Sequence, residues 1–306
     1  MSPDNYKRND PCPCQSGKPY KFCHQPIFDA AYDEMLPVAQ REYELDWRGN
    51  SSHYRDQGLY ESLAGELVAA GSVAKVLDIG SGRGEGIEAL RGVLPQDHLI
   101  VGIDENPKCL EVAAVILGLS ADAVSDNRIA VTAHQDKTYE ISLVPGRLKP
   151  IRPVTLIQSD VLLEDGELVE CLSNAGPFDA ITLWFTGIHK AKQSARAMKE
   201  RGITSDAVHR QAVEDAAASL GSLLLRPGGW LQLASRGAHS DETAIKSEYE
   251  PEMLDLGQTN GFDLRTISAR PYTEPSGGRR LGVRSLDFDR SGLKLFVLSA
   301  LFQKPS

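Results

Sequence analysis

The segment KVLDIGSGRGEGIEAL, residues 75–90, decides the fold. Its first part, VLDI at 76–79, predicts a β-strand, and the glycines at alternate positions that follow lead into a helix expected at 85–92. Glycine lets the backbone approach a ligand closely, and the free N–H groups of a helix N-terminus face that ligand. Asp78, near the end of the strand, would stabilise the loop or accept a hydrogen bond from a ligand ammonium group. The segment therefore predicts a ligand-binding loop.

A second strand with an acidic end follows. LIVGID ends at Asp104, which lies 22 residues after Gly82. A carboxylate about 20 residues beyond the glycine-rich turn can hydrogen-bond both ribose hydroxyls of a nucleotide. The dinucleotide pattern G-x-G-x-x-G fails in the two registers nearest the strand, because Glu85 and Ile87 stand where its third glycine is required. A nucleoside ligand without a pyrophosphate agrees better with this pattern.

The order of these features resembles the class I S-adenosylmethionine-dependent methyltransferases. The resemblance spans about 60–302 and includes later segments: VTLIQSD (154–160), PFDAITLWFTG (177–187), LRPGGWLQLAS (225–235), and the pair FDLRTISARPY and LKLFVLSALFQ. It implies an α/β protein with a Rossmann-like, seven-stranded, mostly parallel sheet whose sixth and seventh strands are an antiparallel pair. It also implies S-adenosyl-L-methionine as the cofactor.

The resemblance further implies which residues bind this cofactor. Asp160 would accept from the adenine amino group, and the backbone N–H of Val161 would face a ring nitrogen. Trp184 could lie beside the sulfonium or stack a planar substrate, or belong equally to the core. The predicted cofactor-binding residues are Asp78, Gly80, Ser81, Gly82, Gly84, Asp104, Glu105, Asp160, Val161 and Trp184.

The methyl acceptor is not indicated. His189, just after the fourth strand, is the candidate general base, and an exposed loop histidine is the alternative. LWFTG replaces the Asn/Asp-Pro-Pro-aromatic turn of base-amino methyltransferases, and the paired-glutamate loop of protein arginine methyltransferases is missing there. A protein, an RNA and a small anionic molecule all stay open as acceptors.

The first 26 residues hold a separate motif. Cys12, Cys14, Cys23 and His24 follow the pattern C-x-C-x8-C-H, whose three thiolates and one imidazole suit the closed tetrahedral shell of structural zinc. So short a segment with so few apolar residues would scarcely fold without a metal. The segment DPCPCQSGKPYKFCH resembles the SEC-C zinc motif of the translocase motor ATPase. In that protein the motif docks a chaperone or the ribosome. A docking role is implied here, with a passive stabilising knuckle as the alternative.

These patterns divide the chain into three parts. Residues 1–26 would be the SEC-C-like zinc-binding motif, 27–72 a helical connection or N-terminal cap, and 73–306 the S-adenosylmethionine-binding domain. An insertion at about 120–152 contains a possible hairpin at 128–146. The polar stretch 46–58 is predicted to be a loop that could cover a ligand mouth.

Composition limits the remaining classes. The chain has 306 residues, is 41% hydrophobic and carries a net charge of −9, which disfavours a protein that coats phosphates. Its longest apolar run, at 112–119, is too short for a bilayer, and no secretory signal is visible, so we expect a soluble cytoplasmic protein without membrane partners. Two locally basic segments, 187–201 and 265–294, are predicted to be solvated surface. The stretch 189–202 could instead attract an anionic acceptor.

The function best supported by the sequence is methyl transfer from S-adenosyl-L-methionine to an unknown acceptor, with a zinc knuckle that docks a ribosome, a chaperone or another partner. A binding or scaffold protein with the same fold but no turnover is the main alternative. A nicotinamide-dependent oxidoreductase is disfavoured by the glycine spacing.

Overall fold

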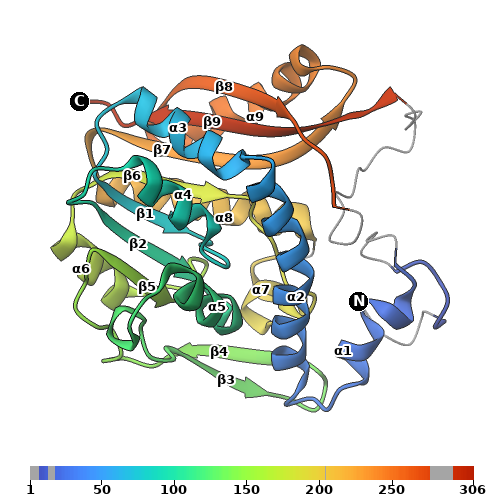
Figure 1. Cartoon of the computed structure of the whole chain (residues 1–306). Helices are drawn as coiled ribbons and strands as arrows, with labels where there is room; N and C mark the ends of the chain where they lie inside the picture. The colour runs from blue at the N-terminus through green and yellow to red at the C-terminus, as the bar shows by residue number, and fades with distance from the viewer. Residues whose placement is uncertain (1–6, 13–17, 204, 276–291) are drawn as a thin grey trace.

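The computed structural model describes residues 7–12, 18–203, 205–275 and 292–306. A central sheet is covered by helices on both faces (Figure 1). Its strands are β1 (Lys75–Ile79), β2 (Leu99–Asp104), β5 (Val154–Gln158), β6 (Phe178–Trp184), β7 (Leu225–His239), β8 (Asp263–Pro271) and β9 (Lys294–Gln303). Their order across the sheet is β5-β2-β1-β6-β7-β9-β8, and β9 runs antiparallel to both of its neighbours. This is the seven-stranded, mostly parallel sheet that the sequence predicts.

Two apolar layers hold the helices against the sheet. One face carries α3 (Leu59–Ala70), α4 (Glu85–Val93) and α5 (Pro107–Leu117), and the other carries α6 (Gly166–Ala175), α8 (Asp206–Leu224) and α9 (Glu242–Asn260). Successive side chains of a strand point to opposite faces, so Val76 joins the first layer and Leu77 the second. Burial on both faces explains why the central strands are almost continuous apolar runs.

Helix α2 (Met35–Asp56) corrects one expectation. Residues 46–56 were predicted to be part of a loop, but they continue this long helix, which runs beside the sheet (Figure 1). Pro37 does not break it, because Pro37 lies in the first turn, where backbone N–H groups have no partner within the helix. Gly58 then takes a left-handed conformation and starts α3.

The insertion contains the expected hairpin. Strands β3 (Ile129–Ala133) and β4 (Tyr139–Leu143) pair antiparallel and form a separate two-stranded sheet. Helix α9 begins at Glu242, where the Asp241 side chain accepts from the backbone N–H of Ala244. The remaining short elements are α1 (Gln25–Asp29), α7 (Arg196–Glu200), η2 (Tyr20–Phe22), η3 (Ala121–Ala123) and η4 (Lys192–Ser194). Within the described ranges, none of the helices has the length and apolar character needed to span a membrane.

Candidate functional site

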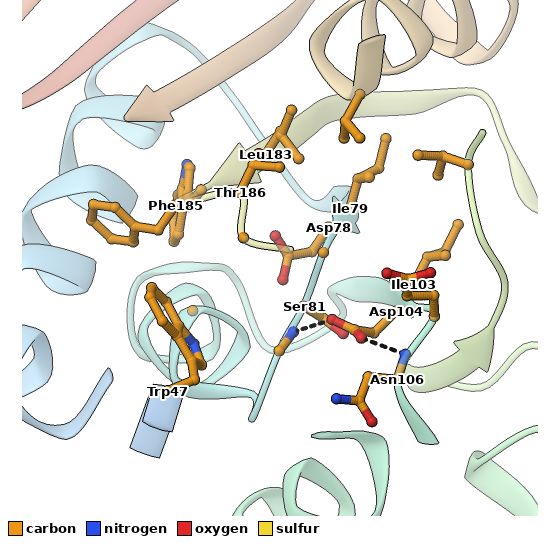
Figure 2. Close-up of a pocket in the computed structure, with 18 of the residues that line it drawn as sticks. Trp47, Asp78, Ile79, Ser81, Ile103, Asp104, Asn106, Leu183, Phe185 and Thr186 are labelled. Atoms are coloured by element: carbon orange, nitrogen blue, oxygen red, sulfur yellow. Dashed lines mark hydrogen bonds between the residues drawn. The ribbon is translucent and has the colours of Figure 1, made fainter. Parts of the chain in front are cut away.

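A pocket opens where the chain changes direction across the sheet. Strands β1, β2 and β5 follow one another toward one edge, whereas β6 lies on the other side of β1. Ligands of open α/β sheets bind beyond the carboxyl ends of the strands at such a switch point. The pocket there has an empty volume of about 900 Å³, with the solvent at its mouth included, and its floor is the loop 80–83 (Figure 2).

Asp104 connects two parts of this floor. Its Oδ2 accepts a hydrogen bond from the Gly82 N–H at 2.8 Å, and its Oδ1 accepts from the Asn106 N–H at 2.8 Å (Figure 2). Burial raises the pKa of Asp104 to about 6, although both backbone hydrogen bonds act to lower it. Each carboxylate oxygen has a second lone pair, so the group can still accept from a ligand hydroxyl.

Asp78 is the second buried acid of the floor. It lies at the end of β1, and its Oδ1 accepts from the Thr182 hydroxyl at 2.7 Å. Burial, together with a smaller effect of the nearby Asp104 charge, raises the pKa of Asp78 to about 7, against the lowering effect of the Thr182 hydrogen bond. A buried carboxylate with one protein partner is suited to a cationic ligand group.

The raised pKa of Asp78 has a predicted effect on stability. Between pH 3.8 and about 7 the folded chain holds a proton that the unfolded chain has released. The contribution of this group to the free energy of unfolding therefore falls as pH rises through that window, by at most about 1.4 kcal/mol per pH unit. We expect Asp78→Asn to remove this slope, so that the variant is more stable than the wild type at pH 8 but not near pH 4.

Urea unfolding at pH 4.5, 6 and 8 measures this effect. Asp179, at the opposite end of the sheet, is the matched control. Burial acts to raise its pKa, but hydrogen bonds from Arg226 and from the backbone lower it overall. Asp179→Asn should therefore lose stability at pH 8. An unchanged pH slope in Asp78→Asn would contradict the assigned burial effect.

Nine of the ten predicted cofactor residues line the pocket. The exception among these ten, all of which the structure describes, is Gly84. It has a left-handed φ of +89°, and a Cβ there would lie 3.1 Å from Leu117 and 3.2 Å from Ala113. Gly84 therefore allows the start of α4 to pack against α5, which is a structural requirement rather than a ligand contact.

Two lysines of the basic segment 187–201 are buried, which corrects the prediction of solvated surface at these positions. Lys192 is fully buried, and its Nζ lies 2.5 Å from Asp160 Oδ2 and also contacts Glu105. Lys190 is also largely buried and forms an ion pair with Asp46. Arg196 donates to Glu140 at 2.7 Å. Lys190 and Lys192 are therefore engaged inside the chain, whereas Arg196 pairs with Glu140 at the surface.

Aromatic side chains cover the pocket from α2 and β6. Tyr43 and Trp47 lie one helical turn apart on α2, and both line the pocket together with Tyr60, Trp184 and Phe185. Figure 2 shows Trp47 on the side of the pocket opposite Asp104. Trp184 and Phe185 are both buried and also line the pocket. Tyr43 and Tyr60 were not predicted, although the Tyr43–Trp47 spacing marks one face of a helix.

An ion pair attaches α2 to the glycine-rich loop. Arg83 donates to Glu44 at 2.7 Å and to Glu85 at 3.3 Å, and the Ser51 hydroxyl donates to Glu85 at 2.9 Å. Glu85 is the first residue of α4 and is buried. A carboxylate at this helix N-terminus occupies the place where a dinucleotide would put its pyrophosphate, which disfavours that class of ligand.

His189 lies in the pocket wall. It is buried, with its Nε2 3.8 Å from Glu105 Oε1, so the alternative of an exposed loop histidine is wrong. Glu105 is itself one of the predicted nucleoside-binding residues. The role of His189 as a general base stays a prediction.

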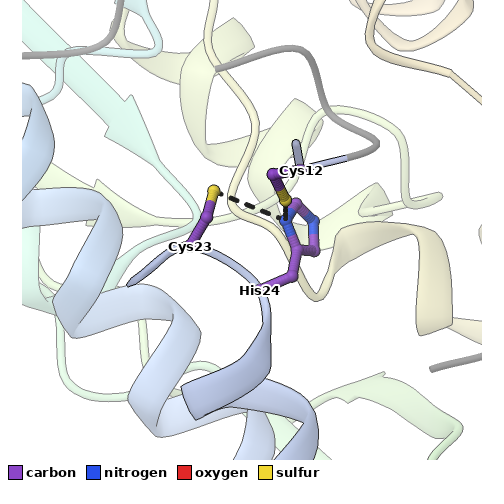
Figure 3. Close-up of side chains that lie close together, drawn as sticks. All are labelled: Cys12, Cys23 and His24. Atoms are coloured by element: carbon purple, nitrogen blue, oxygen red, sulfur yellow. Dashed lines mark hydrogen bonds between the residues drawn. The ribbon is translucent and has the colours of Figure 1, made fainter. Parts of the chain in front are cut away.

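Three of the four predicted metal ligands come together. The donor atoms of Cys12, Cys23 and His24 all lie within 4.8 Å of one another, and His24 Nδ1 is 3.0 Å from the Cys12 sulfur and 3.6 Å from the Cys23 sulfur (Figure 3). Two thiols and an imidazole this close together form a donor set that one zinc ion could bind. Cys14 lies outside the described residues.

The knuckle is packed against the rest of the chain next to the pocket. Lys190 Nζ donates to the Cys23 carbonyl at 3.3 Å, and it shares Asp46 of α2 with Lys18. Lys137 of the hairpin donates to the Phe28 carbonyl of α1. The N-terminal segment thus contacts the same loop that carries His189 and Lys192.

Comparisons with known proteins give one family match and several distant structural likenesses. Residues 8–26 match the family model of the SEC-C motif, and a search of the curated proteins found no match. Among solved structures, the chain resembles TrmN from Thermus thermophilus, at 15% identity and a TM-score of 0.41, over 80% of this chain and 48% of TrmN. The chain therefore spans about half the length of TrmN.

Two further solved structures cover similar shares. The N-methyltransferase NodS from Bradyrhizobium japonicum, in complex with S-adenosyl-L-homocysteine, is 13% identical with a TM-score of 0.41, over 82% of this chain and 87% of NodS. A protein from Galdieria sulphuraria assigned as a sarcosine dimethylglycine methyltransferase is 15% identical with a TM-score of 0.46, over 88% and 98%. The sheet itself, which is seven-stranded and mostly parallel with β9 antiparallel to both of its neighbours, has the class I methyltransferase fold. The chain also carries an N-terminal SEC-C motif.

Proposed function

We propose that this protein is an S-adenosyl-L-methionine-dependent methyltransferase with a zinc-binding SEC-C knuckle. The observation that carries the proposal is the Asp104 carboxylate, which is fixed by the N–H groups of Gly82 and Asn106 at the floor of the pocket. This arrangement supports a nucleoside, because a fixed acceptor beside a glycine loop can bind sugar hydroxyls. The buried Glu85 at the helix N-terminus argues against a pyrophosphate.

Each wall of the pocket has a proposed role. Asp104 and Glu105 would bind the ribose, Asp160 and the Val161 N–H the adenine, and Asp78 the ammonium of the amino-acid moiety. Bound S-adenosyl-L-methionine would supply an activated methyl group. The aromatic wall of Trp47, Trp184 and Phe185 would exclude water and align the acceptor, and His189 is the proposed general base.

Calorimetry and methyl labelling test the proposal. We expect S-adenosyl-L-methionine and S-adenosyl-L-homocysteine to bind with one site per chain, whereas NAD should not bind. Methyl-labelled S-adenosyl-L-methionine, added to a fractionated lysate, should then label one acceptor class. Tight binding without any labelled product would support a scaffold protein, and binding of NAD alone would contradict the proposal.

We also propose that Cys12, Cys14, Cys23 and His24 bind one zinc ion. The donor atoms of the three described ligands are close enough for one tetrahedral shell, and two thiols beside an imidazole form a donor set that zinc prefers. Docking of a ribosome or a chaperone through the knuckle stays a prediction from the motif. The contacts of Lys190 with Cys23 and Asp46 support a role toward the chain's own pocket as well.

A further inference from the structure

Lys192 is a buried cation that joins the ends of two strands. It belongs to η4, and its side chain is 1% exposed. Its Nζ lies 2.5 Å from Oδ2 of Asp160, which follows β5, and also contacts Oε2 of Glu105, which follows β2. Lysine is almost never fully buried unless it is paired, because removing its charge from water costs several kcal/mol. This site is therefore arranged around the ammonium group.

The ion pair fixes the orientation of Asp160. While Oδ2 faces Lys192, Oδ1 accepts from the Leu162 N–H at 3.0 Å. Asp160 is thus held from both sides, and it still lines the pocket together with Glu105. A carboxylate offers about four lone-pair positions, so each oxygen retains capacity to accept one more hydrogen bond.

The Lys192 side chain is enclosed by other residues of the protein and is almost completely shielded from solvent. Tyr139 of β4 and His209 of α8 face it, and His189 lies on its own loop next to Glu105. Burial acts to lower the pKa of Lys192, but attraction to Asp160 and Glu105 raises it above its usual value. The residue is therefore a permanent positive charge between two acids.

We propose that Lys192 is a positioning residue for nucleoside recognition: it holds the Asp160 and Glu105 carboxylates side by side, so that Asp160 selects a purine with an exocyclic amino group. The inference rests on the proposed function, because it concerns the nucleoside end of the same pocket. Without the ammonium group, two carboxylates would be left close together with no cation between them. Such a pair repels, and one member would take up a proton or turn away. Either change removes the acceptor for the amino group.

The test compares two ligands that differ at one position of the base. S-Adenosyl-L-homocysteine carries an amino group there, and S-inosyl-L-homocysteine carries an oxo group. Calorimetry on the full chain should show that the wild type prefers the adenosyl ligand by about a hundredfold, because the oxo group faces a carboxylate. Lys192→Met should reduce this preference at least tenfold, and Lys192→Arg should restore most of it.

Controls separate positioning from general damage. Lys199→Met, an exposed lysine of the same segment, should keep the wild-type preference. If Lys192→Met does not fold, Lys192→Gln is measured in its place. A preference equal to that of the wild type, or tighter adenosyl binding, in the folded variant would overturn the inference alone. A wild type that binds neither ligand would overturn the proposed function and the inference with it.

Discussion

Replacing Asp104 by alanine is expected to weaken the binding of S-adenosyl-L-homocysteine by about a hundredfold or more. The carboxylate accepts one backbone hydrogen bond from Gly82 and one from Asn106, both at 2.8 Å. Its removal frees the glycine loop from the β2–α5 turn and also removes the proposed acceptor for the ribose. Hydrogen bonds to a charged group contribute about 1.5–3 kcal/mol each, so the loss of the two proposed hydrogen bonds from the ribose hydroxyls accounts for an effect of this size. Calorimetry measures it directly.

Two further variants define the cause. Asp104→Asn keeps one acceptor oxygen and should lose only about tenfold in affinity. Asp97→Ala changes an exposed acid in the turn before the same strand, and its affinity should equal that of the wild type. An Asp104→Ala variant that unfolds at the same urea concentration as the wild type and binds the ligand equally well would remove the basis of the functional assignment.

Local patterns were sufficient to predict the frame of the pocket. The strand expected at 99–104 is β2 with the same bounds, because a buried parallel strand is a short apolar run between turn residues. Asp78, Gly82 and Asp104 could be placed together because the carboxyl ends of adjacent parallel strands meet at one edge of the sheet. The hairpin in the insertion followed from its alternating pattern.

Helix α2 shows where apolar periodicity fails. Its buried face at 47–54 consists of Trp47, Asn50, Ser51 and Tyr54, at helical spacing. Two of these four are polar, so the pattern resembles a loop. Their polar atoms are used inside the protein, since the Asn50 amide donates to Tyr54 at 2.9 Å and the Ser51 hydroxyl donates to Glu85. Tertiary partners of this kind cannot be deduced from neighbouring residues.

Lys192 shows the same limit for charge. A basic segment is usually solvated, and the local count gave no sign that this residue is buried. Its partners, Asp160 and Glu105, lie 32 and 87 residues away in the chain. The fold brings these three residues together only because β2 and β5 are neighbours in the sheet. The charge of the segment therefore did not predict that Lys192 is buried.

The zinc knuckle and the pocket share one loop. Lys190 donates to the Cys23 carbonyl, and Lys192, two residues later, holds the nucleoside end of the pocket. Asp46 of α2 pairs with Lys190 and with Lys18, so the long helix that covers the pocket also contacts the knuckle. A structural metal that orders the knuckle would therefore support this loop as well. The acids proposed to bind the cofactor lie at strand ends and should not depend on the metal.

Replacing Cys23 by serine should abolish stoichiometric zinc binding. Cys23 is 1% exposed and forms a small buried cluster with Cys12 and Tyr20. A serine hydroxyl is a far poorer zinc ligand than a thiolate, and the remaining donors would no longer close a tetrahedral shell. Metal analysis should give about one zinc per chain for the wild type and almost none for the variant. Limited proteolysis should then cut the variant first within residues 8–26.

Cys171→Ser is the matched control, because this half-buried cysteine lies on α6, away from the knuckle. It should keep its zinc and the proteolysis pattern of the wild type. Cys23→Ser should still bind S-adenosyl-L-homocysteine, since Asp78, Asp104 and Asp160 remain on the ends of β1, β2 and β5. Equal zinc content in Cys23→Ser and the wild type would contradict the metal site, because a buried thiolate that is a ligand cannot be removed without loss of affinity.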